Sequence, residues 1–119
     1  MGMTNNLEFV ETIRKFQKST LTSDDELILR GNLSSKLFSK LVNESSYIPS
    51  KNVVFSFGIA MKLNENELSS LLNSCGYALN KTNLLDLIVC FYIDSNLYDV
   101  YKINNALFNY NILPLGEKD

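Results

Sequence analysis

The sequence contains no histidine and no tryptophan, and it has only two cysteines and two prolines among 119 residues. Histidine is the commonest general base and a common metal ligand, so its absence argues against most hydrolytic and metal-dependent chemistry. The two cysteines, Cys75 and Cys90, lack the Cys-x-x-Cys spacing of a metal or redox motif and lie in apolar surroundings. We therefore expect reduced, buried thiols, with a disulfide as the alternative.

Long apolar runs and targeting signals are also lacking. The longest apolar stretch, residues 84–93, is too short to cross a bilayer and contains Asp86. The N-terminus is polar and does not resemble a signal peptide. No glycine-rich phosphate loop is present, and the adjacent acids Asp24, Asp25 and Glu26 do not converge on one helix face. We expect a cytoplasmic protein without catalytic activity, cofactor, bound metal or membrane contact.

The remaining composition is that of an ordinary folded domain. Apolar residues make up 45% and charged residues 20% of the chain, which argues against disorder and allows a hydrophobic core. The length predicts a single domain over residues 1–119. The net charge is only −2, but residues 28–52 carry four basic residues against one acid, whereas residues 61–119 carry four lysines against seven acids. Positive charge is therefore concentrated in one segment.

Capping signals and apolar periodicity predict helices along the chain. A helix-capping residue is followed three positions later by glutamate in three places, which is the spacing of a capping box: Asn5 and Glu8, Ser23 and Glu26, Asn64 and Glu67. Gly31 and Gly76 are expected to end helices in the left-handed conformation. The expected helices span about 6–18, a short segment through 28–29, 34–43, 51–63, a segment after residue 64, 84–93 and 99–110.

The apolar residues of these segments predict the core. Segment 51–63 is apolar over most of its circumference, which predicts a central position. Segment 84–93 fits a buried strand as well as a buried helix, and its helical neighbours favour the helix. The inner face expected for the helix at 34–43 consists of Leu37, Phe38 and Leu41. The inner face expected for the helix at 99–110 consists of Val100, Ile103, Leu107 and Phe108. Four late tyrosines are expected to pack the last two helices, with a protein contact as the alternative: Tyr92, Tyr98, Tyr101 and Tyr110.

A short helix, a glycine turn and a second short helix in the basic segment have the form of a helix-turn-helix. In that motif the second helix enters the major groove of DNA. Lysines can contact phosphates, and serines and asparagines can contact phosphates or bases. The candidate DNA-binding residues are Ser34, Ser35, Lys36, Ser39, Lys40 and Asn43, with Lys51 and Asn52 as an additional phosphate clamp. The alternative is an ordinary solvated helix face.

Several motifs also carry a family resemblance. They are LSSKLFSKL at 33–41, YIPSK at 47–51, IAMKLNENELSSLL at 59–72, CGYALN at 75–80, LLDLIVCFYI at 84–93, YDVYKINNALFNY at 98–110 and LG at 115–116. In this order and spacing they resemble a family of helix-turn-helix domains of the λ-repressor/Cro type from bacterial and phage proteins. The resemblance implies an all-α fold, with a DNA-binding-type core of about five helices over residues 6–79 and two additional C-terminal helices over residues 80–119.

The chain departs from this family at two places. The family often has arginine or lysine where this sequence has Val42, Asn43 and Glu44, and the loss of these basic residues argues against tight DNA binding. The family also has a serine where this sequence has Asn80. The leading hypothesis is a transcriptional regulator that binds double-stranded DNA as a homodimer, because one short recognition helix buries too little surface to select a site. The alternative is a protein-interaction module with the same fold, such as an antitoxin-like, phage-defence or anti-defence partner, contacting another protein through its last two helices.

Overall fold

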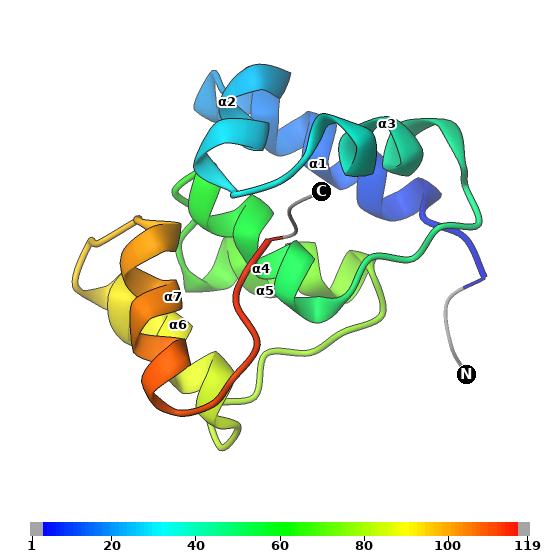
Figure 1. Cartoon of the computed structure of the whole chain (residues 1–119). Coiled ribbons are helices and arrows are strands. Elements are labelled where there is room, and N and C mark those ends of the chain that lie inside the picture. Colours follow the sequence, from blue (N-terminus) through cyan, green and yellow to red (C-terminus); the bar gives the residue numbers. More distant parts are fainter. Residues whose placement is uncertain (1–3, 117–119) are drawn as a thin grey trace.

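A computed structural model of the chain describes residues 4–116, and every regular element in that range is an α-helix (Figure 1). The helices are α1 (Leu7–Thr20), α2 (Asp24–Arg30), α3 (Ser35–Asn43), α4 (Lys51–Ala60), α5 (Glu65–Ser74), α6 (Leu84–Asp94) and α7 (Val100–Asn109). The all-α prediction is confirmed, including a helix at the ambiguous apolar stretch. Within this range, no helix has both the length and the apolar character that crossing a membrane requires.

The helix starts largely follow the predicted caps. Two of the three expected capping boxes, at Ser23 before α2 and at Asn64 before α5, are present with reciprocal hydrogen bonds. The first cap is displaced by one position: Asn6 occupies the N-cap of α1 without a side-chain capping bond, and the Asn5 Oδ1 atom accepts a hydrogen bond from the Leu7 N–H group. The local sequence therefore determines most helix starts.

The turn between α2 and α3 differs from the prediction. Gly31 has a right-handed conformation with φ of −85°, and Asn32 takes the left-handed one with φ of 55°. Glycine is needed at position 31 for space, because a Cβ atom there would lie 2.7 Å from the Leu27 carbonyl oxygen and 3.0 Å from the Leu33 Cδ1 atom. Gly76 does take the left-handed conformation after α5, as predicted, with φ of 83°.

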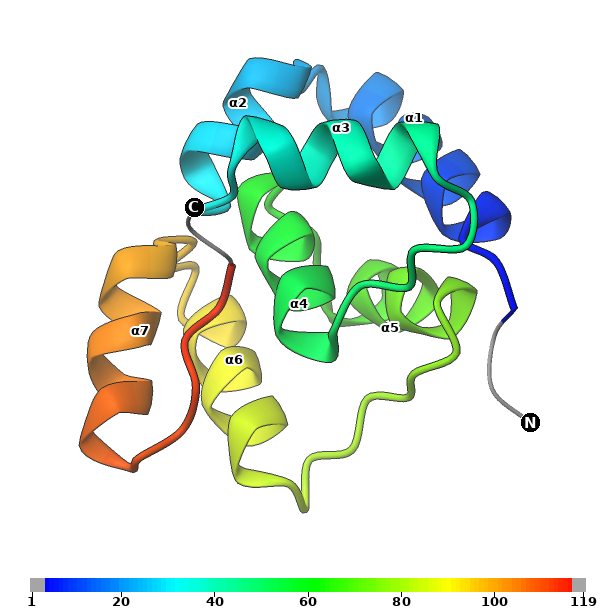
Figure 2. The ribbon, with the colours of Figure 1, turned by 45° about the vertical axis from the view of Figure 1, so that its right-hand side comes forward.

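Helix α4 is the centre of the core, as its uniformly apolar sequence predicts. Every residue from Val53 to Ala60 is buried. The Phe57 ring lies 5.7 Å from the ring of Phe9 in α1 and 6.3 Å from that of Phe38 in α3, measured between centroids. Helix α3 crosses over α4, so that α4 supports it from the inside (Figure 2). The helix ends at Ala60, three residues earlier than expected, and Lys62 takes a left-handed conformation.

Helices α6 and α7 lie side by side against α4, on the side opposite α5 (Figure 2). Val100, Ile103 and Leu107 of α7 are buried, as predicted. The prediction for Phe108 is wrong: its side chain is 79% exposed, because one residue step turns it about 100° around the helix from Leu107. The four late tyrosines differ in burial: Tyr92 and Tyr98 are partly buried, as expected for packing, whereas Tyr101 and Tyr110 are exposed.

The segment after α7 runs back to the turn between α2 and α3 (Figure 2). The Leu115 N–H group donates to the Asn104 side chain at 2.7 Å, and the Leu115 carbonyl accepts from Asn104 and Asn32 at 3.1 and 3.3 Å. Gly116 follows with φ of 82°, and a Cβ atom there would lie 2.5 Å from the backbone oxygens of Gly31 and Asn32. The C-terminal segment therefore fixes the two helices on either side of this turn to α7.

Candidate nucleic-acid interface on α3

Helix α3 has an apolar inner face and a polar outer face. Leu37, Phe38 and Leu41 are buried, as predicted. Five of the predicted site residues are exposed on the outside: Ser35, Lys36, Ser39, Lys40 and Asn43. Residues three and four positions apart in a helix lie on the same side, so these five form one continuous strip, called here the α3 outer face. The last four of them, together with Glu44, line a shallow depression of about 410 Å³.

The side chains of the α3 outer face also contact one another and their neighbours. The Asn43 amide donates a 3.2 Å hydrogen bond to the Ser39 hydroxyl. The Lys40 ammonium lies 4.8 Å from the centroid of the Tyr47 ring, an arrangement that favours a cation by about 0.5–1 kcal/mol at an exposed site. Glu44, at the C-cap of α3, places a negative charge at the end of the strip. The face therefore offers two ammonium groups and three hydrogen-bonding side chains, bounded by one acid.

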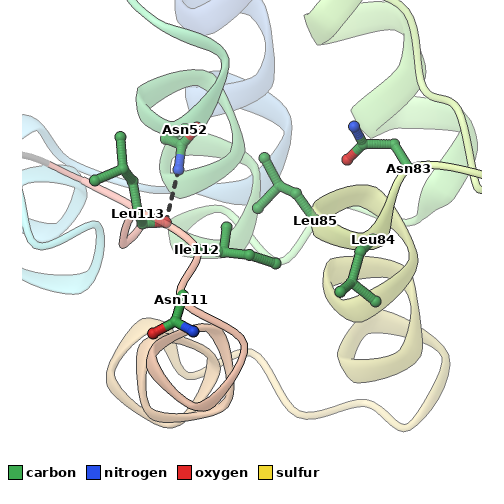
Figure 3. A pocket seen from close by; sticks show the side chains of 7 residues that line it. All are labelled: Asn52, Asn83, Leu84, Leu85, Asn111, Ile112 and Leu113. Atoms are coloured by element: carbon green, nitrogen blue, oxygen red, sulfur yellow. Dashed lines mark hydrogen bonds between the residues drawn. The ribbon is translucent and has the colours of Figure 1, made fainter.

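Three other predicted site residues have structural contacts instead. Ser34 is buried, and its hydroxyl caps α3 by accepting from the Leu37 N–H group. The Lys51 ammonium forms a 2.8 Å ion pair with the buried Asp86 carboxylate, and the Asn52 amide donates to the carbonyls of Leu113 and Pro114, the first of these bonds being drawn in Figure 3. The expected phosphate clamp at Lys51 and Asn52 is therefore replaced by contacts that hold the C-terminal part of the chain.

A second hollow lies where the starts of α4 and α6 meet the segment after α7 (Figure 3). It measures about 450 Å³ and is lined by Asn52, Asn83, Leu84, Leu85, Asn111, Ile112 and Leu113. None of these side chains is ionisable, and residues 4–116 contain no group of three or more potential metal-ligating side chains. We assign no ligand to this hollow.

Helix α3 is held at its C-terminal end by Asn6, which precedes α1. The Asn6 side chain is only 2% exposed, and its amide donates to the carbonyls of Leu41, Glu44 and Tyr47 at distances of 2.8–3.1 Å. The last carbonyls of a helix have no partner within the helix, so this amide supplies a donor to the Leu41 carbonyl and also connects the turn after α3 to the start of α1. The sequence did not indicate this role, because an asparagine before a helix is usually a cap.

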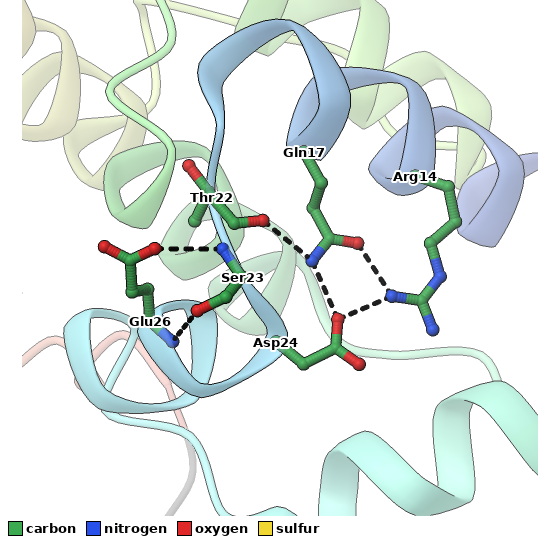
Figure 4. A network of polar contacts seen from close by, with 6 residues as sticks. All are labelled: Arg14, Gln17, Thr22, Ser23, Asp24 and Glu26. Atoms are coloured by element: carbon green, nitrogen blue, oxygen red, sulfur yellow. Dashed lines mark hydrogen bonds and ion pairs between the residues drawn. The ribbon is translucent and has the colours of Figure 1, made fainter.

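A polar network connects α1 with the start of α2 (Figure 4). The buried Gln17 amide donates to the Thr22 carbonyl and to the Asp24 carboxylate, and its oxygen accepts from the Arg14 guanidinium at 2.8 Å. Arg14 also forms a 2.6 Å ion pair with Asp24 and lies 5.4 Å above the ring of Phe38. Arg14 of α1 therefore contacts both the beginning of α2 and the inner face of α3. The network fixes the position of α2 relative to α3.

The hydrogen bond from Gln17, together with the bond and charge of Arg14, lowers the pKa of Asp24 from its ordinary value of 3.8, while burial partly opposes them. A carboxyl group whose pKa is lower in the folded than in the unfolded protein stabilises the fold at pH values above its unfolded-state pKa. This stabilisation is lost as the pH falls through the folded-state pKa. Asp24→Asn should therefore lose stability at neutral pH and differ less from the wild type below about pH 3.8. Solvent screening keeps the effect below about 1 kcal/mol, because both charged partners are about half exposed.

Urea unfolding at neutral and acid pH measures this difference. Asp25→Asn is the matched control, because it removes the same charge from the same first turn of α2 without touching Gln17. An equal pH dependence in the two variants would show that the network contributes nothing beyond the interaction of a carboxylate with the helix dipole.

The two cysteines are buried, unpaired thiols, as the sequence predicts. Burial raises the pKa of both Cys75 and Cys90 to about 11, with the Glu65 charge adding to the effect at Cys90. A thiol with such a pKa is protonated at neutral pH and is a poor nucleophile or metal ligand. The α3 outer face is therefore the best-defined candidate site of the described residues.

Comparison with known proteins adds no assignment: no family model, no curated protein and no solved structure matches this chain. Its class is therefore defined by the fold and by the surface alone. Over residues 4–116 it is an all-α protein in which α3 presents a lysine-bearing polar face, supported by α1, α2 and α4.

Proposed function

We propose that this protein binds double-stranded DNA through the α3 outer face and regulates transcription. In this proposal α2, the Gly31–Ser34 turn and α3 form a helix-turn-helix of the λ-repressor type, and α3 enters the major groove. The observation that carries the proposal is the continuous strip of two lysines, two serines and an asparagine on one side of α3. These side chains match the contacts that such helices make to phosphates and base edges.

The charges of the α3 outer face predict the affinity and the salt dependence of DNA binding. Lys36 and Lys40 are one helical turn apart and can each neutralise a phosphate, whereas Glu44 at the end of the helix repels the DNA backbone. The number of basic groups is small, so we expect moderate affinity with a shallow salt dependence, because each neutralised phosphate changes the slope of log affinity against log salt by only about −0.9. Ser39 and Asn43 lie on the same strip and are the candidates for direct contact with bases.

Binding of the purified protein to duplex DNA at two salt concentrations tests this proposal. Lys36→Ala and Lys40→Ala should each weaken binding to all sequences, and each should reduce the slope of log affinity against log salt by about 1. Lys102→Ala is the matched control, because it removes an exposed lysine from α7, outside the α3 outer face.

Asn43→Ala separates base recognition from phosphate contact. It should relax the preference for one sequence by about 1–3 kcal/mol and leave the salt dependence unchanged. Absence of wild-type binding even at about 50 mM salt would overturn the proposal, because electrostatic contacts are strongest there. The α3 outer face would then be a solvated surface, and the protein-interaction module would become the leading hypothesis.

A further inference from the structure

An apolar groove lies between α6 and α7 on the described surface, called here the α6–α7 groove. It measures about 480 Å³ and is lined by Leu84, Leu87, Ile88, Phe91, Tyr92, Ala106 and Tyr110. Several of these side chains are unusually open to solvent: Leu87 is 48%, Phe91 63% and Tyr110 59% exposed. Isolated exposed apolar residues are common, but a contiguous group of this kind marks an interaction surface.

The α6–α7 groove carries no charged side chain among its lining residues. In a twofold-symmetric dimer, the same patch of each copy faces its counterpart. A charged patch would then bring like charges together, whereas an uncharged apolar patch pairs with itself without repulsion. This property distinguishes the groove from the α3 outer face, whose two lysines suit a polyanion and not a second copy.

The exposed area of the groove also fits a second copy. Phe91 is 63% exposed and its ring lies 5.7 Å from the Tyr92 ring, so each copy offers an open aromatic ring beside the apolar hollow that both residues line. The exposed parts of Leu84, Leu87, Phe91 and Tyr110 amount to roughly 400 Å² per copy, judged from the 150–250 Å² that an aromatic side chain buries. Two copies would bury on the order of 800 Å² of apolar surface, which is below the range of stable interfaces and corresponds to a weak, transient contact.

We propose that two copies of this chain associate through their α6–α7 grooves, with the Phe91 ring of each copy inserted against α6 and α7 of the other. The contact is a small bundle of four helices, a common arrangement for two helical pairs with apolar faces. Its modest area is that of a weak, transient interface, so the dimer is expected only at high protein concentration. The α3 outer face belongs to another part of the surface (Figure 2), so the dimer does not depend on the proposed DNA binding.

Sedimentation of the full chain at increasing concentration, without DNA, tests the proposal. The wild type should change from monomer to dimer between about 1 and 200 µM. Phe91→Lys should remain monomeric throughout, corresponding to at least a roughly 30-fold weaker dimer, because a hot-spot aromatic is replaced by a charge in an apolar contact. Phe108→Lys is the matched control: Phe108 is also on this helical pair and is even more exposed, but it does not line the groove.

Two results would overturn the proposal. One is a wild type that stays monomeric over the whole range, which would leave the groove to a different protein partner. The other is a dimer that Phe108→Lys weakens as much as Phe91→Lys does. Leu87→Lys provides a second groove variant if Phe91→Lys does not fold, which circular dichroism would reveal. Since no DNA is present, failure of the dimer is distinguishable from failure of DNA binding.

Discussion

Replacing Phe57 with alanine is expected to lower the free energy of unfolding by about 3–5 kcal/mol, as measured by urea titration. Phe57 is fully buried in α4, and its ring packs edge-on against Phe9 and at an angle against Phe38. The substitution removes the contacts between rings and leaves a cavity where three helices meet, and the close packing of a protein core does not allow the neighbours to fill it completely.

The same substitution should also affect α3. Phe38 lies on the inner face of α3, and Phe57 is the part of α4 against which its ring rests. Loss of Phe57 is therefore expected to increase the hydrogen exchange of α3 amides more than that of α6 amides. Phe57→Leu, which keeps most of the apolar volume, should cost distinctly less.

Phe108→Ala serves as the control for removing a phenyl ring. Its side chain is 79% exposed, so its loss should change stability by no more than about 0.5 kcal/mol. A loss of less than about 1 kcal/mol for Phe57→Ala would contradict the central position of α4 in the core.

These two phenylalanines show what local sequence patterns can and cannot predict. The run of apolar residues in segment 51–63 indicates a helix buried on all sides, and Phe57 lies within it. Phe108 follows an apolar residue on a helix with a buried stripe, and its apolar character alone suggested that it belonged to that stripe. Phe108 lies about 100° around the helix from Leu107, which places it outside the buried stripe of Val100, Ile103 and Leu107.

In the candidate site too, the sequence predicts some features and not others. The five residues of the α3 outer face follow from helical periodicity, because the buried positions Leu37, Phe38 and Leu41 fix the opposite side. The contacts of Asn6, Lys51 and Asn52 join residues 35–62 positions apart, and such polar contacts have no periodic signature. The apolar run at residues 84–93 predicted a buried helix, but its outer side is the α6–α7 groove.

The turn before α3 is a further example. Gly31 and Asn32 are both residues that commonly end helices, so the sequence indicates the position of the turn. Asn32 takes the left-handed conformation, and Gly31 is required instead by Leu27 and Leu33, which leave no space for a side chain at position 31. The prediction of a stop is confirmed, and the predicted conformation of the glycine is wrong.

Replacing Asp86 with alanine is the second substitution with a large expected effect. The Asp86 side chain is fully buried, and its Oδ2 atom accepts hydrogen bonds of 2.8 Å from the Lys51 ammonium and from the Asn80 N–H group. Its removal would leave both donors without this acceptor, and breaking a buried ion pair on one side typically costs about 3–5 kcal/mol. We expect about 3 kcal/mol in urea unfolding, since Lys51 is about one quarter exposed and water can solvate it in part.

A double-mutant cycle with Lys51→Met tests whether the loss comes from the pair itself. Lys51→Met leaves a carboxylate whose other oxygen, Oδ1, accepts no hydrogen bond from the described residues, so this variant should be at least as unstable as Asp86→Ala. Asp86→Leu is the second single variant of the cycle, measured beside Asp86→Ala. The double variant Lys51→Met and Asp86→Leu should recover much of the loss, because an apolar pair of similar volume avoids the cost of burying charge. If the double variant were as unstable as the sum of the single ones, the two groups would not interact. The attachment of α6 to α4 would then depend on apolar packing alone.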